Sequence, residues 1–123
     1  MPTMNSIVLY VENPHKSAQF YQDLLGTATV QKAPTFCMFA LEGGIMLGLW
    51  SRHTVAPPAK NTAGAVELGF PLTDKAAVDA LYQTWADEGI TMVQEPIQMG
   101  FGYSFTAIDL DGHRLRVFFP NPN

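Results

Sequence analysis

Cysteine and positive charge are both scarce in this sequence. Cys37 is the single cysteine among 123 residues, so an internal disulfide and a cysteine-rich metal site are excluded. It lies in the apolar run FCMFAL, which predicts a core position for its side chain. Seven Lys and Arg residues against eleven Asp and Glu give a net charge of −4, without any run of basic residues. Phosphate backbones are bound by basic patches, so we do not expect nucleic acid as a partner.

Long apolar runs are absent as well. The stretch MPTMNSIVLYVENP lacks a basic start and reaches Asn13-Pro14 before it is long enough for a signal or a membrane-spanning segment. We therefore expect a cytoplasmic protein without membrane contact. Apolar residues make up 47% of the chain, which suits one compact domain with a core of its own.

The first half of the sequence predicts a strand, a helix and three more strands. Asn13-Pro14 suits a helix start, and Gly26 suits its end. Gly43-Gly44 predicts a hairpin turn between the last two strands. The strands are expected at 6–11, 28–32, 36–41 and 45–50.

The second half repeats this pattern after a polar, proline-rich connection. Thr73-Asp74 predicts a second helix start, and Gly89 predicts its end. Asp111-Gly112 predicts a tight turn that closes a final hairpin. Strands are expected at 65–72, 90–93, 103–109 and from this turn to 120, with a loop at 95–102.

The repeated order predicts an α+β fold of two βαβββ modules. Module 1 covers about residues 1–52, the linker 53–63 and module 2 about 64–123, all within one domain. One such module cannot bury both faces of its sheet alone. We expect the modules to form a curved mixed sheet around a cleft, either within one chain or between the chains of a homodimer with shared clefts.

Two segments carry a family resemblance that covers nearly the whole chain. SAQFYQDLLG at 17–26 and DLDGHRLRVF at 109–118 resemble the first-helix and hairpin signatures of the vicinal oxygen chelate superfamily, with Leu110 replacing the usual proline. Its members include glyoxalase I, extradiol dioxygenases, fosfomycin-resistance enzymes and bleomycin-resistance proteins. The resemblance implies a divalent metal held by His, Gln or Glu side chains on the first and last strands of each module.

The residues at the implied metal positions are Ser6, Gly48, Glu67 and Arg116. Only Glu67 is a good ligand, and Arg116 brings a permanent cation to the site. We therefore predict no metal, no other cofactor and no catalytic residue. The resemblance places Glu67 and Arg116 on neighbouring strands, either as a structural ion pair or as groups that meet a ligand.

The segments LGLWSR, AVELGFPLTD and VQEP with FGYSF resemble the phenazine-resistance and quinoxaline-binding members more closely. This resemblance implies a metal-free protein that sequesters a planar aromatic antibiotic. Such rings bind by stacking on aromatic faces and soft methionine side chains. We expect Gly48 to leave a slot for a flat ring, and Phe101 and Tyr103 to lie in a loop over the opening. The candidate ligand-binding residues are Trp50, Met46, Gly48, Phe101, Tyr103, Arg116, Phe118, Glu67 and Ser6.

Other aromatic and titratable side chains have simpler interpretations. The sequence favours core positions for Phe36, Met38, Phe39, Phe105 and Trp85. His15 and His113 flank a helix start and a turn, so we expect them in solvent, and His53 could lie at the rim of the cleft.

Two alternative functions remain open at this point. One is a glyoxalase-type lyase or isomerase with an atypical site, which a stoichiometric divalent ion would favour. The other is a dimerisation module without a ligand, in which Trp50, Phe101 and Tyr103 would fill the cleft themselves.

Overall fold

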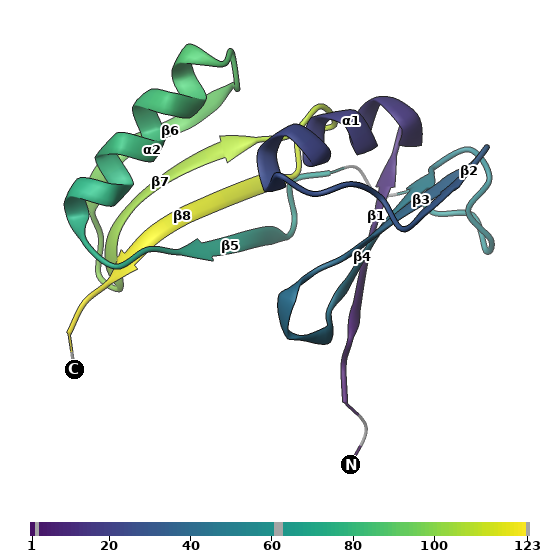
Figure 1. The fold of residues 1–123 in the computed structure, drawn as a ribbon, viewed down its shortest axis with the longest axis horizontal. Coiled ribbons are helices and arrows are strands. Elements are labelled where there is room, and N and C mark those ends of the chain that lie inside the picture. The colour runs from purple at the N-terminus through teal and green to yellow at the C-terminus, as the bar shows by residue number, and fades with distance from the viewer. Residues whose placement is uncertain (2, 61–62, 123) are drawn as a thin grey trace. The chain divides into compact units, whose positions relative to one another are not determined.

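The computed structural model describes residues 1, 3–60 and 63–122. The chain divides into two compact units, Met1–Asn61 (unit 1) and Thr62–Asn123 (unit 2) (Figure 1). Each unit contains one helix and one four-stranded mixed sheet in the order βαβββ. The predicted α+β class and the two repeated modules are therefore confirmed.

Unit 1 is a mixed sheet with its helix on one side. Its elements are β1 (Ser6–Val11), α1 (Pro14–Leu25), β2 (Gln31–Ala33), β3 (Phe36–Ala40), a short 3-10 turn (Glu42–Gly44) and β4 (Met46–Ser51). The strand order is β1-β4-β3-β2, with β1 parallel to β4 and the other pairs antiparallel. The first and last strands of the module pair, as the family resemblance implies.

Helix α1 begins and ends at the predicted residues. The Asn13 side chain accepts hydrogen bonds from the backbone N–H groups of His15 and Lys16, both at 3.1 Å, and Pro14 occupies the first turn. Gly26 takes the left-handed conformation at φ 70° and donates to the carbonyl of Gln22.

Side chains that point toward α1 form the core of unit 1. Tyr21 on the helix and the alternate residues of β1, β3 and β4 are buried; the strand residues are Leu9, Val11, Cys37, Phe39, Leu47 and Leu49. The predicted core positions of Cys37 and Phe39 are confirmed. Burial raises the pKa of the Cys37 thiol, which keeps the group in its neutral form.

Unit 2 repeats the plan with β5 (Glu67–Pro71), α2 (Lys75–Asp87), β6 (Met92–Gln98), β7 (Gly102–Ile108) and β8 (Arg114–Pro120). The strand order is β5-β8-β7-β6, and α2 covers one face of this sheet (Figure 1). Asp74 caps α2 by accepting from the backbone N–H of Ala77 at 2.7 Å. Trp85 of α2 meets Phe105 edge to face at 5.6 Å, and both are buried as predicted.

Strand β6 is longer than the sequence predicts. Residues 95–98 continue the strand, where a loop was expected. Pro96 misled the prediction, because proline usually interrupts a strand. Proline is nevertheless compatible with an edge strand, and β6 lies at the edge of its sheet with two register shifts against β7.

The hairpin between β7 and β8 is also wider than a two-residue Asp-Gly turn. The last paired residues are Ile108 and Arg114, so five residues form the connection. Asp109 organises it, because its carboxylate accepts from the backbone N–H groups of Asp111 and His113, both at 2.9 Å.

The two sheets share one register between their first and last strands. Ser6 pairs with Met46 in unit 1, and Glu67 pairs with Arg114 in unit 2. The equivalent positions are 6 and 67, 46 and 114, 48 and 116, and 50 and 118. Any position on the open side of one sheet can therefore be compared with its counterpart in the other.

The segment after β4 was expected to be an exposed connection. Val55 departs from this expectation, because only 5% of it is exposed. Within the described residues, neither helix is long and apolar enough to cross a membrane.

Candidate ligand-binding faces

The side of each sheet that faces away from its helix is the open face of that unit. In unit 1 this face carries Ser6, Val8, Tyr10, Phe36, Met38, Met46, Gly48 and Trp50, which alternate with the buried core residues. Val8 and Tyr10 are each 42% exposed. Three candidate ligand-binding residues, Met46, Gly48 and Trp50, therefore share this face.

Three aromatic side chains form a row across the open face of unit 1. Trp50 in β4 pairs with Tyr10 in β1 and with Phe36 in β3. The Trp50 ring lies 6.3 Å from Tyr10 and 6.4 Å from Phe36, at interplanar angles of 84° and 86°. Both contacts are edge to face, a favourable arrangement for aromatic rings. The row is an aromatic surface on which another ring can pack.

The space left by Gly48 is filled by Phe36. A Cβ atom at Gly48 would lie 2.8 Å from Cζ of Phe36 and 3.2 Å from Cγ2 of Val8. A ring does lie against this glycine, but it is a side chain of the protein. The expectation of an empty slot was wrong.

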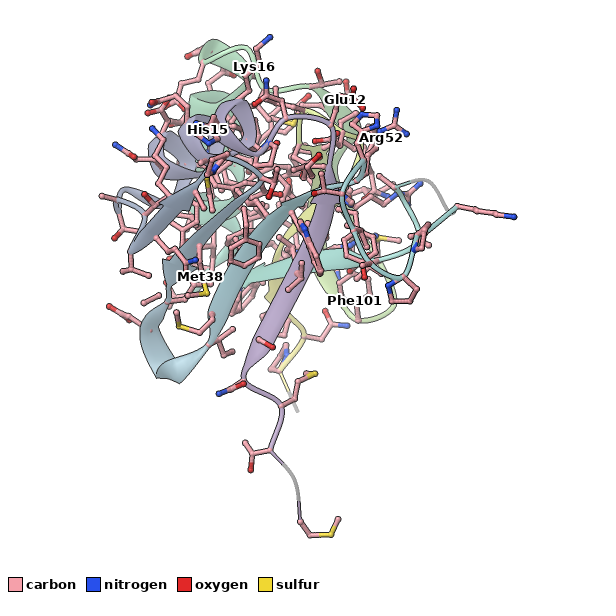
Figure 2. The ribbon with its side chains drawn as sticks, turned by 90° about the vertical axis from the view of Figure 1, so that its right-hand side faces the viewer. Glu12, His15, Lys16, Met38, Arg52 and Phe101 are labelled. Carbon is pink, nitrogen blue, oxygen red and sulfur yellow. The ribbon has the colours of Figure 1, made fainter. Side chains whose placement is uncertain are left out.

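Phe36 and Met38 were expected in the core, and this prediction was also wrong. Both are half-buried on the open face, because they share the alternation of Trp50 and Gly48 across the β3–β4 pairing (Figure 2 labels Met38). Sequence reasoning also missed Tyr10. Its position two residues after Val8 and four after Ser6 was the signal that could have identified it.

The open face of unit 2 is built around an ion pair. Nε of Arg116 donates to both carboxylate oxygens of Glu67 at 3.1 and 3.3 Å, and Nη2 donates to Oε1 at 3.1 Å. The Arg116 side chain is only 12% exposed, whereas that of Glu67 is 46% exposed. The predicted proximity of these two residues is confirmed, and the ion pair is bidentate.

Polar side chains from β6 and β7 hold the other end of Arg116. Nη1 donates to Oε1 of Gln94 at 3.1 Å and to Oγ of Ser104 at 3.4 Å, and it lies 3.6 Å from Sδ of Met99. Gln94 Oε1 also accepts from Thr106 at 3.1 Å. Sequence reasoning missed this network, because its members become neighbours only through strand pairing.

Two phenylalanines lie beside Arg116. The Phe101 ring is 5.6 Å from the guanidinium carbon of Arg116 and 6.1 Å from the Phe118 ring. Phe101 is 46% exposed and precedes β7 in the turn after β6, as expected (Figure 2). The open face of unit 2 thus presents an aromatic ledge, Phe101 with Phe118, next to a carboxylate and a fixed cation.

Tyr103 does not belong to this face. It lies inside β7, at the start of the strand expected at 103–109, and its hydroxyl donates to Oδ1 of Asp79 on α2 at 2.6 Å. Lys75 on the same helix lies over its ring at 5.4 Å. The hydrogen bond to the Asp79 carboxylate raises the pKa of Tyr103. The side chain packs on the helix side of the sheet, so its expected placement over the opening was wrong.

Another polar cluster lies where β1 and β4 end. Glu12 accepts from Nε of Arg52 and from Nε2 of His53, the latter at 2.8 Å (Figure 2). Hydrogen bonds from His53 and Arg52 lower the pKa of Glu12. His15, expected in solvent, is also engaged: its Nε2 lies 2.8 Å from the carbonyl oxygen of Ala33.

The residues at the implied metal positions do not fit a divalent ion. Unit 1 offers the hydroxyl of Ser6 and the bare backbone of Gly48, while the carboxylate of Glu67 in unit 2 is already bound to Arg116. A guanidinium cannot be a metal ligand and repels a cation. Among the described residues, no group of three or more His, Cys, Asp or Glu side chains is placed to hold a metal.

Comparison with known proteins identifies relatives with several activities. The chain is 29% identical over 118 residues to the phenazine antibiotic resistance protein EhpR of Enterobacter agglomerans, covering 94% of this chain and 90% of EhpR. It is 30% identical over 118 residues to the metallothiol transferase FosB of Staphylococcus haemolyticus, covering 93% and 81%.

The solved structure of protein ATC0852 from Agrobacterium tumefaciens is also similar, with a TM-score of 0.91, 48% identity and coverage of 99% of this chain and 100% of ATC0852. A family model described as glyoxalase/bleomycin resistance protein/dioxygenase superfamily matches residues 3–117. The chain belongs to this superfamily.

Proposed function

We propose that the protein binds a planar aromatic antibiotic without a metal and thereby sequesters it. The aromatic row of unit 1, Tyr10–Trp50–Phe36, is the observation that carries this proposal. A row of three edge-to-face rings, with Met38 and Met46 on the same open face, offers apolar, polarizable area to a flat molecule. The similarity to EhpR, whose name states phenazine resistance, supports this ligand class.

The donor set supports the metal-free part of the proposal. Glu67 is the one good ligand at the implied metal positions, and the guanidinium of Arg116 neutralises it. Binding in this protein would then use stacking and hydrogen bonds, with no reaction of the ligand. We also propose a homodimer in the cytoplasm that binds two ligands per dimer, because a two-fold axis repeats each site. Sedimentation of the free and ligand-bound protein measures the number of subunits in the assembly, and calorimetric titration measures the number of ligands per dimer.

Ligand binding to the purified protein tests the proposal. Phenazines and quinoxalines should raise the melting temperature, because they bind only the folded state, and should quench Trp50 fluorescence. Trp50→Ala should weaken binding by about 2 kcal/mol, as is typical for an aromatic anchor. Leu110→Ala, an exposed apolar residue in the β7–β8 connection, is the matched control and should bind normally. Absence of stabilisation and quenching across both ring classes would contradict the proposal.

A glyoxalase-type lyase or isomerase is the second candidate. The similarity to FosB, whose name states a metallothiol transferase, favours a metal-dependent enzyme. Elemental analysis of protein purified without chelators separates the two candidates. A stoichiometric divalent ion favours the enzyme, and a binder requires none.

A further inference from the structure

The Glu67–Arg116 pair has two members with different remaining capacity for hydrogen bonds. A guanidinium has five N–H donors. The contacts to Glu67, Gln94, Ser104 and Met99 engage Nε, Nη1 and one N–H of Nη2. Within the described part of the chain, only the second N–H of Nη2 is left over. Arg116 is 12% exposed, so a ligand has little access to it.

Glu67 is in the opposite situation. An ionised carboxylate accepts about four hydrogen bonds. Arg116 supplies Nε and Nη2 to Oε1, at 3.3 and 3.1 Å, but only Nε to Oε2, at 3.1 Å. The Glu67 side chain is 46% exposed. The acceptor that faces solvent on this face is therefore the carboxylate, and Oε2 has room for a further donor.

The surroundings of Glu67 disfavour a carboxylate on the ligand. Such a group could reach the Nε–Nη2 edge of Arg116 only by displacing Glu67, or by lying beside it as a second negative charge. Arg114 is the other cation on this face: it is exposed and pairs directly with Glu67 in the register. An exposed guanidinium contributes little to binding a charged group in water.

We infer that Glu67 is the ligand-facing polar group of unit 2, and that this face takes a planar aromatic ring carrying a hydrogen-bond donor, such as a phenol or an N–H, in preference to a carboxylate. Arg116 is a positioning residue, because it fixes and orients Glu67 without meeting the ligand itself. The ring would pack on the ledge of Phe101 and Phe118. This inference rests on the proposed function and names the ligand class within it.

Three matched phenazines test the inference: 2-hydroxyphenazine, phenazine-2-carboxylate and unsubstituted phenazine. Their dissociation constants are measured at pH 7 by fluorescence quenching, with EDTA present. The hydroxyl compound should bind at least tenfold tighter than phenazine, and the carboxylate no tighter than phenazine. If the carboxylate binds tightest to the wild-type protein, the inference is overturned while the proposed function stands. If none of the three binds, both are wrong.

Two variants locate the responsible group. Glu67→Gln should bring the dissociation constants of the hydroxyl compound and of phenazine to a ratio of about one. It should also improve binding of the carboxylate compound, because the Nε and Nη2 groups of Arg116 no longer bind a carboxylate of the protein. Arg114→Gln should leave the ranking of the three compounds unchanged. A carboxylate preference that disappears in Arg114→Gln would assign the polar contact to Arg114 and refute the role of Glu67. Melting temperatures confirm that each variant is folded. If Glu67→Gln does not fold, the order of the three dissociation constants for the wild-type protein remains the test of the inference.

Discussion

The equivalent positions Gly48 and Arg116 on the two open faces are occupied by side chains of opposite character. In unit 1 the ring of Phe36, from the third strand, lies over Gly48 of the fourth. In unit 2 the equivalent third-strand residue is Ser104, and the guanidinium of Arg116 from the fourth strand lies against it. One solution is apolar and the other is a charged network. One backbone plan thus supports a stacking surface in one copy and a polar anchor in the other.

The difference extends to how tightly each arrangement is fixed. Phe36 meets Gly48 with the far end of its ring, which can tilt away at modest cost. Arg116 is held by four side chains, one each from β5, β6, the turn after β6 and β7, so moving it breaks several contacts at once. We therefore expect substitutions in the polar network of unit 2 to be more damaging than equivalent ones on the aromatic face of unit 1.

The largest expected effect comes from removing the cation of unit 2. Arg116→Ala should lower the free energy of unfolding by about 2–3 kcal/mol, because Gln94 and Ser104 lose a charged donor and Glu67 loses its counterion. Urea denaturation measures the change. Arg114→Ala, exposed on the same strand, should change stability by no more than about 0.5 kcal/mol. Equal costs for the two variants would mean that the network contributes nothing.

The aromatic side of the comparison is tested by removing Phe36. Phe36→Ala should cost about 1–2 kcal/mol, less than for a fully buried ring, since the side chain is only half-buried. Urea denaturation of this variant beside Leu110→Ala separates lost packing from a general surface effect. A cost above that of Arg116→Ala would reverse the ranking of the two faces.

A double-mutant cycle isolates the contact between Phe36 and Gly48. Gly48→Ala should destabilise the wild-type protein by about 0.5–1 kcal/mol, because the new Cβ forces the Phe36 ring to move. In the Phe36→Ala background the same change should be neutral or stabilising by about 0.5 kcal/mol, since alanine restricts the unfolded chain more than glycine does. Additive costs would show that the ring does not occupy this space.

The smallest expected effect concerns the carboxylate at the end of β1. The pKa of Glu12 is lower in the folded protein than in the unfolded chain, so its contribution to stability is complete above the unfolded pKa. The contribution is lost as the pH falls through the folded pKa. His53→Ala removes the largest cause of the shift and should raise the pKa of Glu12 in a carboxyl-detected NMR titration. An unchanged titration would mean that His53 does not bind Glu12 in solution.

Periodicity and capping residues predicted most of the fold. Asn13, Asp74 and Gly26 marked the helix ends because caps are local and depend on a few consecutive residues. The wide turn at Asp109 and the extension of β6 through Pro96 were missed, since a side-chain hydrogen bond decides the first and an edge position permits the second.

The candidate site was predicted less completely than the fold. Glu67 and Arg116 were paired correctly, because a family resemblance supplied the strand order. Tyr103 was misplaced because its alternation within the predicted strand was not used: it lies on the same side of β7 as Phe105, which packs on α2. Phe36 was assigned to the core because apolar residues on both faces of a strand are alike in a sequence, and only the pairing with Trp50 distinguishes them.

Binding of 2-hydroxyphenazine to protein stripped of metal with EDTA tests the central claim most directly. Isothermal titration calorimetry, combined with elemental analysis of the same sample, measures affinity, stoichiometry and metal content together. The account predicts about one ligand per chain, an affinity unchanged by added Zn²⁺ or Mn²⁺, and recovery of the ligand unaltered. Binding that requires an added divalent ion, or conversion of the ligand, would contradict it.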